Sequence, residues 1–126
     1  NNSPDDALQR YIEAKIQLSL DRPNASKIFA MEVISGAPVI GDYLAHDLKD
    51  WVDKQVEVFE IWQSRGEMAS VSARHVLFLI WAATQTYADF DAQIKAVLGS
   101  TSIHSDEYAE AVETVTGVIL RGLGTR

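Results

Sequence analysis

The segment His75–Phe90, HVLFLIWAATQTYADF, constrains the fold more than any other part of the chain. Eight apolar residues follow one another from Val76 to Ala83, and the short polar residues Thr84, Gln85 and Thr86 come next. At 100° per residue, such a run is apolar on every side of a helix. A helix of this kind must be covered on every side, so the segment predicts a central helix in a helical domain.

The rest of the chain carries helical spacing and helix punctuation as well. Capping residues, first-turn prolines and terminal glycines mark the ends of the segments. No alternating strand pattern or hairpin signal competes with them. The sequence therefore predicts one all-α domain, residues 1–126, of about five helices and a brief helical turn. The expected helices are Ser3 to Pro23, Asn24 to Gly36, Pro38 to Arg65, Ser72 to Phe90 and Ser105 to Gly122, and the turn is Ala92 to Leu98.

Composition excludes several classes of protein. The formal net charge is −7, and the 11 lysines and arginines are scattered, whereas a duplex-DNA binder needs a basic face. The chain has no cysteine, and His46, His75 and His104 lack the spacing of helical metal ligands. No apolar run reaches the roughly 18 residues of a membrane span, and no signal peptide is recognisable. We therefore expect a cytoplasmic protein that is not an enzyme and has no metal, cofactor or membrane partner.

The apolar character of Ser72–Phe90 on both sides raises the question of what covers it. Helices of the same chain can cover one side, and a second subunit is the simplest cover for the other. The helix Ser105–Gly122 also has small and apolar residues outside its main stripe, which favours a four-helix dimer interface formed by both helices. The alternative is a central helix in a monomer. The expected interface residues are Leu79, Ala83, Tyr87, Val112, Val115 and Ile119.

Gln85 lies one turn after Trp81 and on the same side of the helix as Phe78. A buried amide without a partner costs about 1–3 kcal/mol, so something must bond to it. A neighbouring helix could satisfy it, and aromatic residues at helical spacing usually belong to the core. A ligand is the other candidate, and these residues alone leave both open.

Three segments carry a resemblance to a known family. They are SKIFAMEVISGAP, GDYLAHDLKDWVDKQVEVFEIWQSRGEM and LFLIWAATQTYADF, and the likeness extends from about Leu8 to Arg121. The chain resembles the C-terminal region of TetR-family transcriptional repressors and is most similar to the RutR (YcdC-like) subgroup. The pattern Ile-Trp-Ala-x-Thr-Gln-x-Tyr-Ala-Asp-Phe is fairly specific to that subgroup. At the two open positions of this pattern, the chain has Ala83 and Thr86, which differ from the residues of the subgroup. Both lie on the expected dimer side of the helix.

The resemblance implies a domain that dimerises through its last two long helices and binds a small effector. It also implies an N-terminal helix-turn-helix domain that this chain does not contain. The protein would bind DNA only through that domain. Effector binding would change the spacing of the two DNA-binding heads and release the operator. The dimer and the small-molecule effector are therefore the expected partners.

The effector that the subgroup implies is uracil or thymine. Trp81 and Gln85 match the tryptophan and glutamine that line the subgroup's pocket. We expect Phe78 as a second wall, Met31 and Trp62 as closing residues, and Ser19 and Asp42 as further polar contacts. Two alternatives remain: a dimerisation-only helical module without a pocket, and a small helical enzyme, for which the sequence shows no cluster of titratable groups.

Overall fold

The computed structural model describes residues 3–126, and every regular element within them is helical, which confirms the all-α prediction. Six helical segments are present where about five and a turn were expected, because the short segment at 91–98 is a full helix. The helix expected from Pro38 to Arg65 begins at Gly41, after a turn at residues 38–40, and runs to Ser64 with a π-helical stretch inside it. The elements are α1 (Pro4–Asp21), α2 (Pro23–Ile34), α3 (Gly41–Tyr43), η1 (Leu44–Leu48), α4 (Lys49–Ser64), α5 (Ala73–Asp89), α6 (Asp91–Leu98) and α7 (Ser105–Gly122).

The helix ends follow local sequence chemistry. The Oγ of Ser3 accepts a hydrogen bond from the Asp6 amide at 3.2 Å, and the Oγ of Ser72 accepts one from the His75 amide at 3.4 Å. These caps satisfy amides that have no partner inside α1 and α5. At the other end, Gly66 follows α4 with φ of +72°, a left-handed conformation that glycine adopts without strain.

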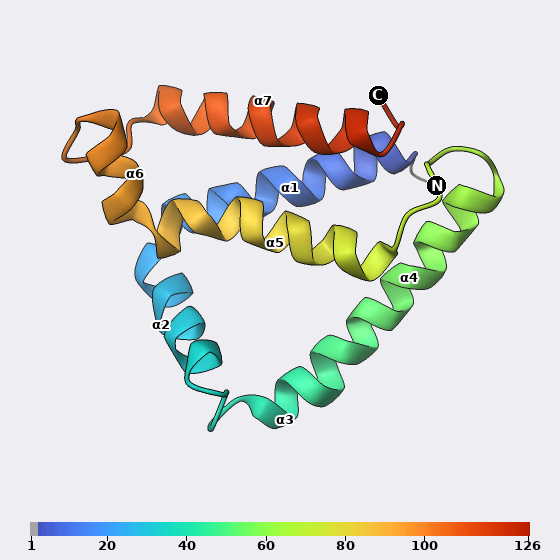
Figure 1. The fold of residues 1–126 in the computed structure, drawn as a ribbon, viewed down its shortest axis with the longest axis horizontal. Helices are drawn as coiled ribbons and strands as arrows, with labels where there is room; N and C mark the ends of the chain where they lie inside the picture. Colours follow the sequence, from blue (N-terminus) through green and yellow to red (C-terminus); the bar gives the residue numbers. More distant parts are fainter. Residues whose placement is uncertain (1–2) are drawn as a thin grey trace.

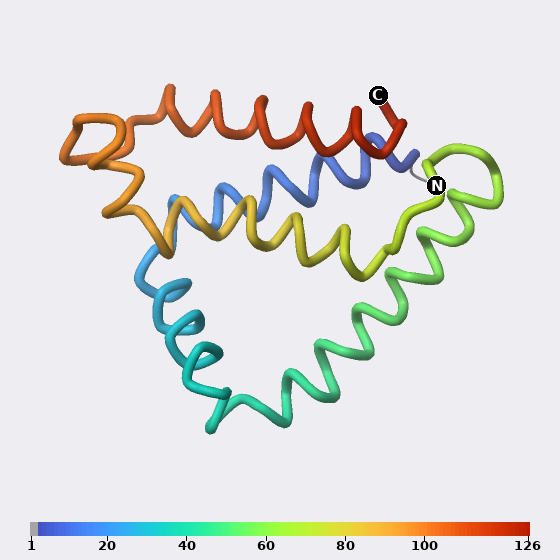
Figure 2. Tube along the Cα trace, viewed as in Figure 1, coloured from blue at the N-terminus to red at the C-terminus, as the bar shows by residue number. Residues whose placement is uncertain are grey.

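The helices form a packed layer and a triangular frame (Figure 1). α1, α5 and α7 lie side by side, with α1 packed against both of the others. From the two ends of α5, α2 and α4 extend away from this layer and converge at α3 (Figure 2). α2, α5 and the continuous rod α3–η1–α4 thus form three sides of a triangle.

The hydrophobic core lies between α1, α5 and α7, with a branch toward the end of α4. Ile12 of α1, Ile80 of α5 and Leu120 of α7 have no exposed surface. Burying side chains of this size contributes about 1.5–3 kcal/mol each. Thr84 is also fully buried, and its Oγ1 donates to the carbonyl oxygen of Ile80 at 2.8 Å, so its hydroxyl is satisfied within α5.

α5 has three faces where the helical wheel suggested two sides. Its core face contains Val76, Leu77, Ile80, Thr84 and Ala88. A second face carries Phe78, Trp81 and Gln85 toward the triangle, and a third exposes the apolar side chains of Leu79 and Phe90. Val76 and Ile80 are therefore covered by the chain itself. Among residues 3–126, no helix combines the length and apolar character that crossing a membrane requires.

Candidate functional site

A cavity of about 930 Å³ lies between the helices of the triangle. Its walls come from α1, α2, the α3–η1–α4 rod and α5. The volume is near the upper end of the roughly 300–1,000 Å³ typical of small-molecule sites. Most of the lining is apolar, with contributions from Leu18, Phe29, Val33, Leu44 and Leu48.

Aromatic side chains form the wall between α1 and α5. The Nε1–H of Trp81 donates a hydrogen bond to the Oη of Tyr11 at 2.8 Å. The Tyr11 ring lies 5.8 Å from the Trp51 ring, centroid to centroid, and both tryptophans line the cavity. Because the tyrosine oxygen accepts from Trp81, its own proton remains available to donate to a ligand. Burial raises the pKa of Tyr11, so this hydroxyl stays neutral at physiological pH.

Gln85 presents its side-chain amide to the same cavity. Its neighbour Thr84 is held by the adjacent helix, because the Oγ of the buried Ser19 donates to the Thr84 carbonyl oxygen at 2.9 Å. The hydrogen bonds of residues 3–126 include none to the Gln85 amide. The group is therefore positioned by a fixed backbone and free to bond to whatever fills the cavity.

Charged groups stand on two walls of the cavity. Lys15 and Arg22 line it from α1 and the residue that ends α1, and Asp47 lines it from η1. Burial lowers the pKa of Lys15, and the charge of Asp89 partly opposes that change. The Asp89 carboxylate accepts a hydrogen bond from the Ser26 hydroxyl. Within residues 3–126, no group of histidine, aspartate and glutamate side chains is arranged to hold a metal ion.

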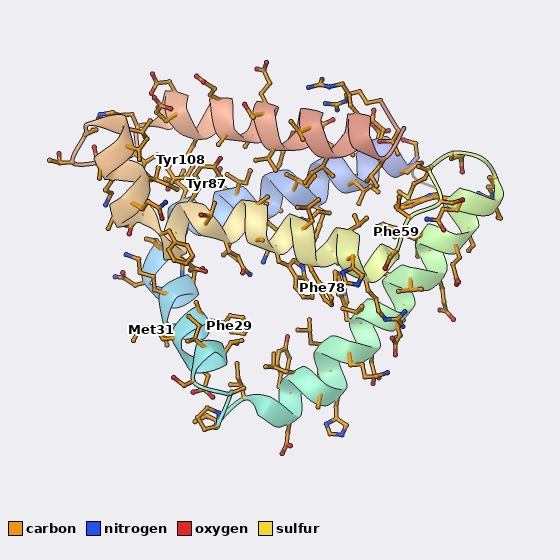
Figure 3. All side chains as sticks on the ribbon, viewed as in Figure 1. Phe29, Met31, Phe59, Phe78, Tyr87 and Tyr108 are labelled. Atoms are coloured by element: carbon orange, nitrogen blue, oxygen red, sulfur yellow. The ribbon has the colours of Figure 1, made fainter. Side chains whose placement is uncertain are left out.

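The structure brings together only some of the residues expected at the site. Trp81, Gln85 and Ser19 line the cavity, whereas Phe78, Met31 and Trp62 do not. The Phe78 ring lies 5.6 Å from the Trp81 ring, so it supports the wall from outside the lining. Met31 is 67% exposed on the outer face of α2, while Phe29 of the same helix points inward (Figure 3). Trp62 is buried in the core against Phe59.

Asp42 also lies outside the lining, whereas Asp47, one turn further along the rod, belongs to it. Asp47 belongs to the π-helical stretch Leu44–Leu48, whose wider turn departs from α-helical spacing. No sequence pattern marks such a turn.

The expected interface residues lie in different surroundings. Leu79 is 55% exposed, and Ala83, Tyr87, Val112 and Val115 are partly buried. Ile119 is buried among the chain's own core residues and already has its contacts there. Val118, one residue before it, is 61% exposed on α7. An apolar surface on α5 and α7 is thus present, with Leu79 and Val118 as its exposed members.

Apart from Ser19, sequence reasoning missed the contribution of α1 and of Arg22, which follows it. Tyr11, Lys15, Leu18 and Arg22 recur at spacings of four, three and four residues, which places them on one face. That face lies beside the core stripe of Leu8, Ile12 and Ile16. The signal was available in the sequence, but nothing local distinguishes such a mixed stripe from an ordinary solvated one.

Comparison with known proteins defines the class of this helical domain. All of the chain, residues 1–126, matches the family described as "YcdC-like protein, C-terminal region", one of the TetR-type C-terminal families. The chain therefore belongs to this family, as the resemblance in its sequence indicated.

The chain is also similar to individual regulators. It is 38% identical over 120 residues to the HTH-type transcriptional regulator RutR of Escherichia coli strain K12, and equally so to the proteins of that name from Escherichia coli O157:H7 and Shigella flexneri. The match covers 95% of this chain and 57% of each relative. The chain thus spans a little over half the length of the curated relatives that it matches.

Proposed function

We propose that this chain is the effector-sensing and dimerisation region of a TetR-type transcriptional regulator. Its cavity would bind a flat pyrimidine such as uracil or thymine. Occupancy would then control DNA binding by an N-terminal helix-turn-helix domain of the kind that the relatives' names indicate. The observation that carries this proposal is the cavity beside Trp81 in which the Gln85 amide has no protein partner.

The chemistry of these two side chains fits a pyrimidine. A glutamine amide offers a donor and an acceptor side by side, which complements the adjacent N–H and C=O groups of the ring. An indole face can stack on a flat base, a contact worth about 1–3 kcal/mol in nucleobase complexes. Trp81 and Gln85 are one turn apart on α5, so both can contact one ring.

The dimerisation-only alternative requires either no cavity beside Trp81 or a Gln85 amide bonded to protein. A cavity of about 930 Å³ and an unbonded amide are the opposite arrangement. Leaving such an amide without a ligand or water would cost on the order of 1–3 kcal/mol if it were fully buried. These observations favour ligand binding over the alternative.

Calorimetric titration of the chain with uracil and with thymine tests the effector assignment. We expect saturable binding that Gln85→Ala weakens by about tenfold or more, which corresponds to about 1.4 kcal/mol. Gln93→Ala is the matched control, because Gln93 is exposed on α6 and outside the cavity. Absence of heat with both bases, in a folded sample, would refute the pyrimidine assignment.

The dimer would form through the exposed apolar surface of α5 and α7. In a two-fold dimer each residue of that surface is used twice, so one substitution changes two contacts. Leu79 is 55% exposed, so burying the exposed part of both leucines would contribute about 1.5–3 kcal/mol, roughly ten- to a hundredfold in the dimer dissociation constant. We therefore expect Leu79→Glu to produce monomers in analytical ultracentrifugation.

Ile28→Glu is the control for that experiment, because Ile28 is 70% exposed on α2 and belongs to neither α5 nor α7. It should leave the wild-type dimer intact. A wild-type chain that sediments as a monomer, or a Leu79→Glu variant that remains dimeric, would contradict the proposed interface.

A further inference from the structure

We infer that the cavity accepts a ligand larger than a free base: a planar ring joined to an anionic group, carboxylate or phosphate, that Lys15 and Arg22 bind. This inference rests on the proposed function and extends it, because Trp81 and Gln85 would hold the ring. The two cations would supply a second subsite on the α1 wall.

The size of the cavity is the first argument. About 930 Å³ is the volume of a site for a drug-sized molecule. A single pyrimidine ring against Trp81 and Gln85 fills only a fraction of that space. A ligand that makes full use of the apolar walls must therefore continue beyond the ring.

The unpaired cations are the second argument. Lys15 and Arg22 line the cavity, yet neither takes part in an ion pair within residues 3–126. Five other lysines and arginines of the chain do form such pairs. Lys15 and Arg22 are seven residues apart, which places them about 20° apart around the axis of α1 and thus on one face.

The neighbouring carboxylates do not neutralise this wall. Asp47 lies on η1, at the corner of the triangle opposite the α1–α5 layer (Figure 1). Asp89 acts on Lys15 through its charge, but it does not line the cavity and already accepts a hydrogen bond from the Ser26 hydroxyl. An anion in the cavity is therefore close to the cations of the α1 wall, while the lining carboxylate, Asp47, lies on the far side of the cavity.

The register between α1 and α5 places the ring subsite beside these cations. Ser19 bonds to the Thr84 carbonyl, so Gln85 lies alongside the last turns of α1. Along that helix, Lys15 precedes Ser19 by about 6 Å and Arg22 follows it by about 4.5 Å. A ring bonded to Gln85 thus has a cation on either side. Burial also lowers the pKa of Lys15, and an anionic partner would reverse that effect by stabilising the ammonium.

Two matched ligand pairs test this inference by calorimetry on the chain. Uracil is compared with orotate, which adds a carboxylate to the ring, and uridine with uridine 5′-monophosphate, which adds a phosphate at a distance. We expect the anionic member of at least one pair to bind about tenfold tighter than its neutral partner. If only orotate binds more tightly than its neutral partner, the anionic group lies beside the ring. If the monophosphate binds more tightly than uridine, the anionic group lies further along the α1 wall.

Variants assign the effect to the two cations. Lys15→Met and Arg22→Gln should each weaken the anionic ligand by about tenfold and change the neutral partner by less than about threefold. Lys54→Met and Arg10→Gln are the controls, because both residues are exposed and outside the cavity. Arg22 is itself exposed, so Arg22→Gln tests the inference even if Lys15→Met impairs folding.

The outcomes separate this inference from the proposed function. Neutral bases that bind with no advantage for their anionic partners would overturn the anion subsite and leave the pyrimidine sensor standing. Anionic ligands that bind through Lys15 and Arg22 when uracil does not would support the subsite and contradict the free base as effector. If no member of either pair binds, the anion subsite is overturned, and so is uracil as the effector.

Discussion

The hydrogen bond from Trp81 to Tyr11 ties α5 to α1 at the wall of the cavity, and its contribution can be measured. The donor and acceptor atoms are 2.8 Å apart. Tyr11→Phe removes the acceptor and leaves the indole N–H without its partner. For a fully buried donor the cost would be about 1–3 kcal/mol. Trp81 is only partly buried and lines the cavity, so water can reach it, and we expect about 0.5–1.5 kcal/mol.

Trp81→Phe removes the donor and part of the apolar area, so we expect a larger loss, about 1–2 kcal/mol. In the double variant neither polar group remains, and the coupling energy of the cycle should be about 0.5–1.5 kcal/mol. The assay is urea unfolding followed by circular dichroism, at one protein concentration because a dimer's stability depends on it. A coupling energy below about 0.3 kcal/mol would refute the reasoning, since two independent substitutions simply add.

Three further predictions concern stability. Lys15→Met should leave the free energy of unfolding unchanged or raise it by up to about 1 kcal/mol. Burial disfavours the charged form of Lys15 and lowers its pKa, and the substitution removes that charge. Lys54→Met, at an exposed site, should change the free energy of unfolding by less than about 0.5 kcal/mol. Asp91 binds lysines of α2 and α6 at 2.8 and 3.2 Å, which lowers its pKa. Its stabilisation is therefore present above the unfolded-state pKa of about 3.9 and is lost as pH falls through the lower folded-state pKa. Asp91→Asn should cost about 0.5–1 kcal/mol at pH 7 and nothing once the wild-type carboxylate is protonated, as urea unfolding across pH will show. Gly66→Ala should lower the thermal midpoint by several degrees, since φ is +72° there, whereas Ala at the helical Gly122 should not.

The sequence predicted the helices and their ends because these depend on neighbours along the chain. A serine cap, a first-turn proline or a terminal glycine acts within one turn, so α1, α5 and α7 begin and end close to where the pattern placed them. The same locality explains why Trp81 and Gln85 lie together in the lining of the cavity. They share a face of one helix, and that relation follows from their spacing alone.

What only the tertiary structure decided is which face of each helix meets which neighbour. Met31 and Phe29 are two residues apart on α2 and therefore face opposite ways, but only the packing of that helix turns Phe29, and not Met31, into the cavity. Trp51 and Trp62 are both tryptophans of α4, but Trp51 lines the cavity and Trp62, further along the helix, is buried in the core. Packing between helices distant in sequence sets these orientations. For this reason the sequence determined a helical domain with Gln85 beside Trp81, and the three-dimensional arrangement alone brought Tyr11, Lys15 and Arg22 to the same cavity.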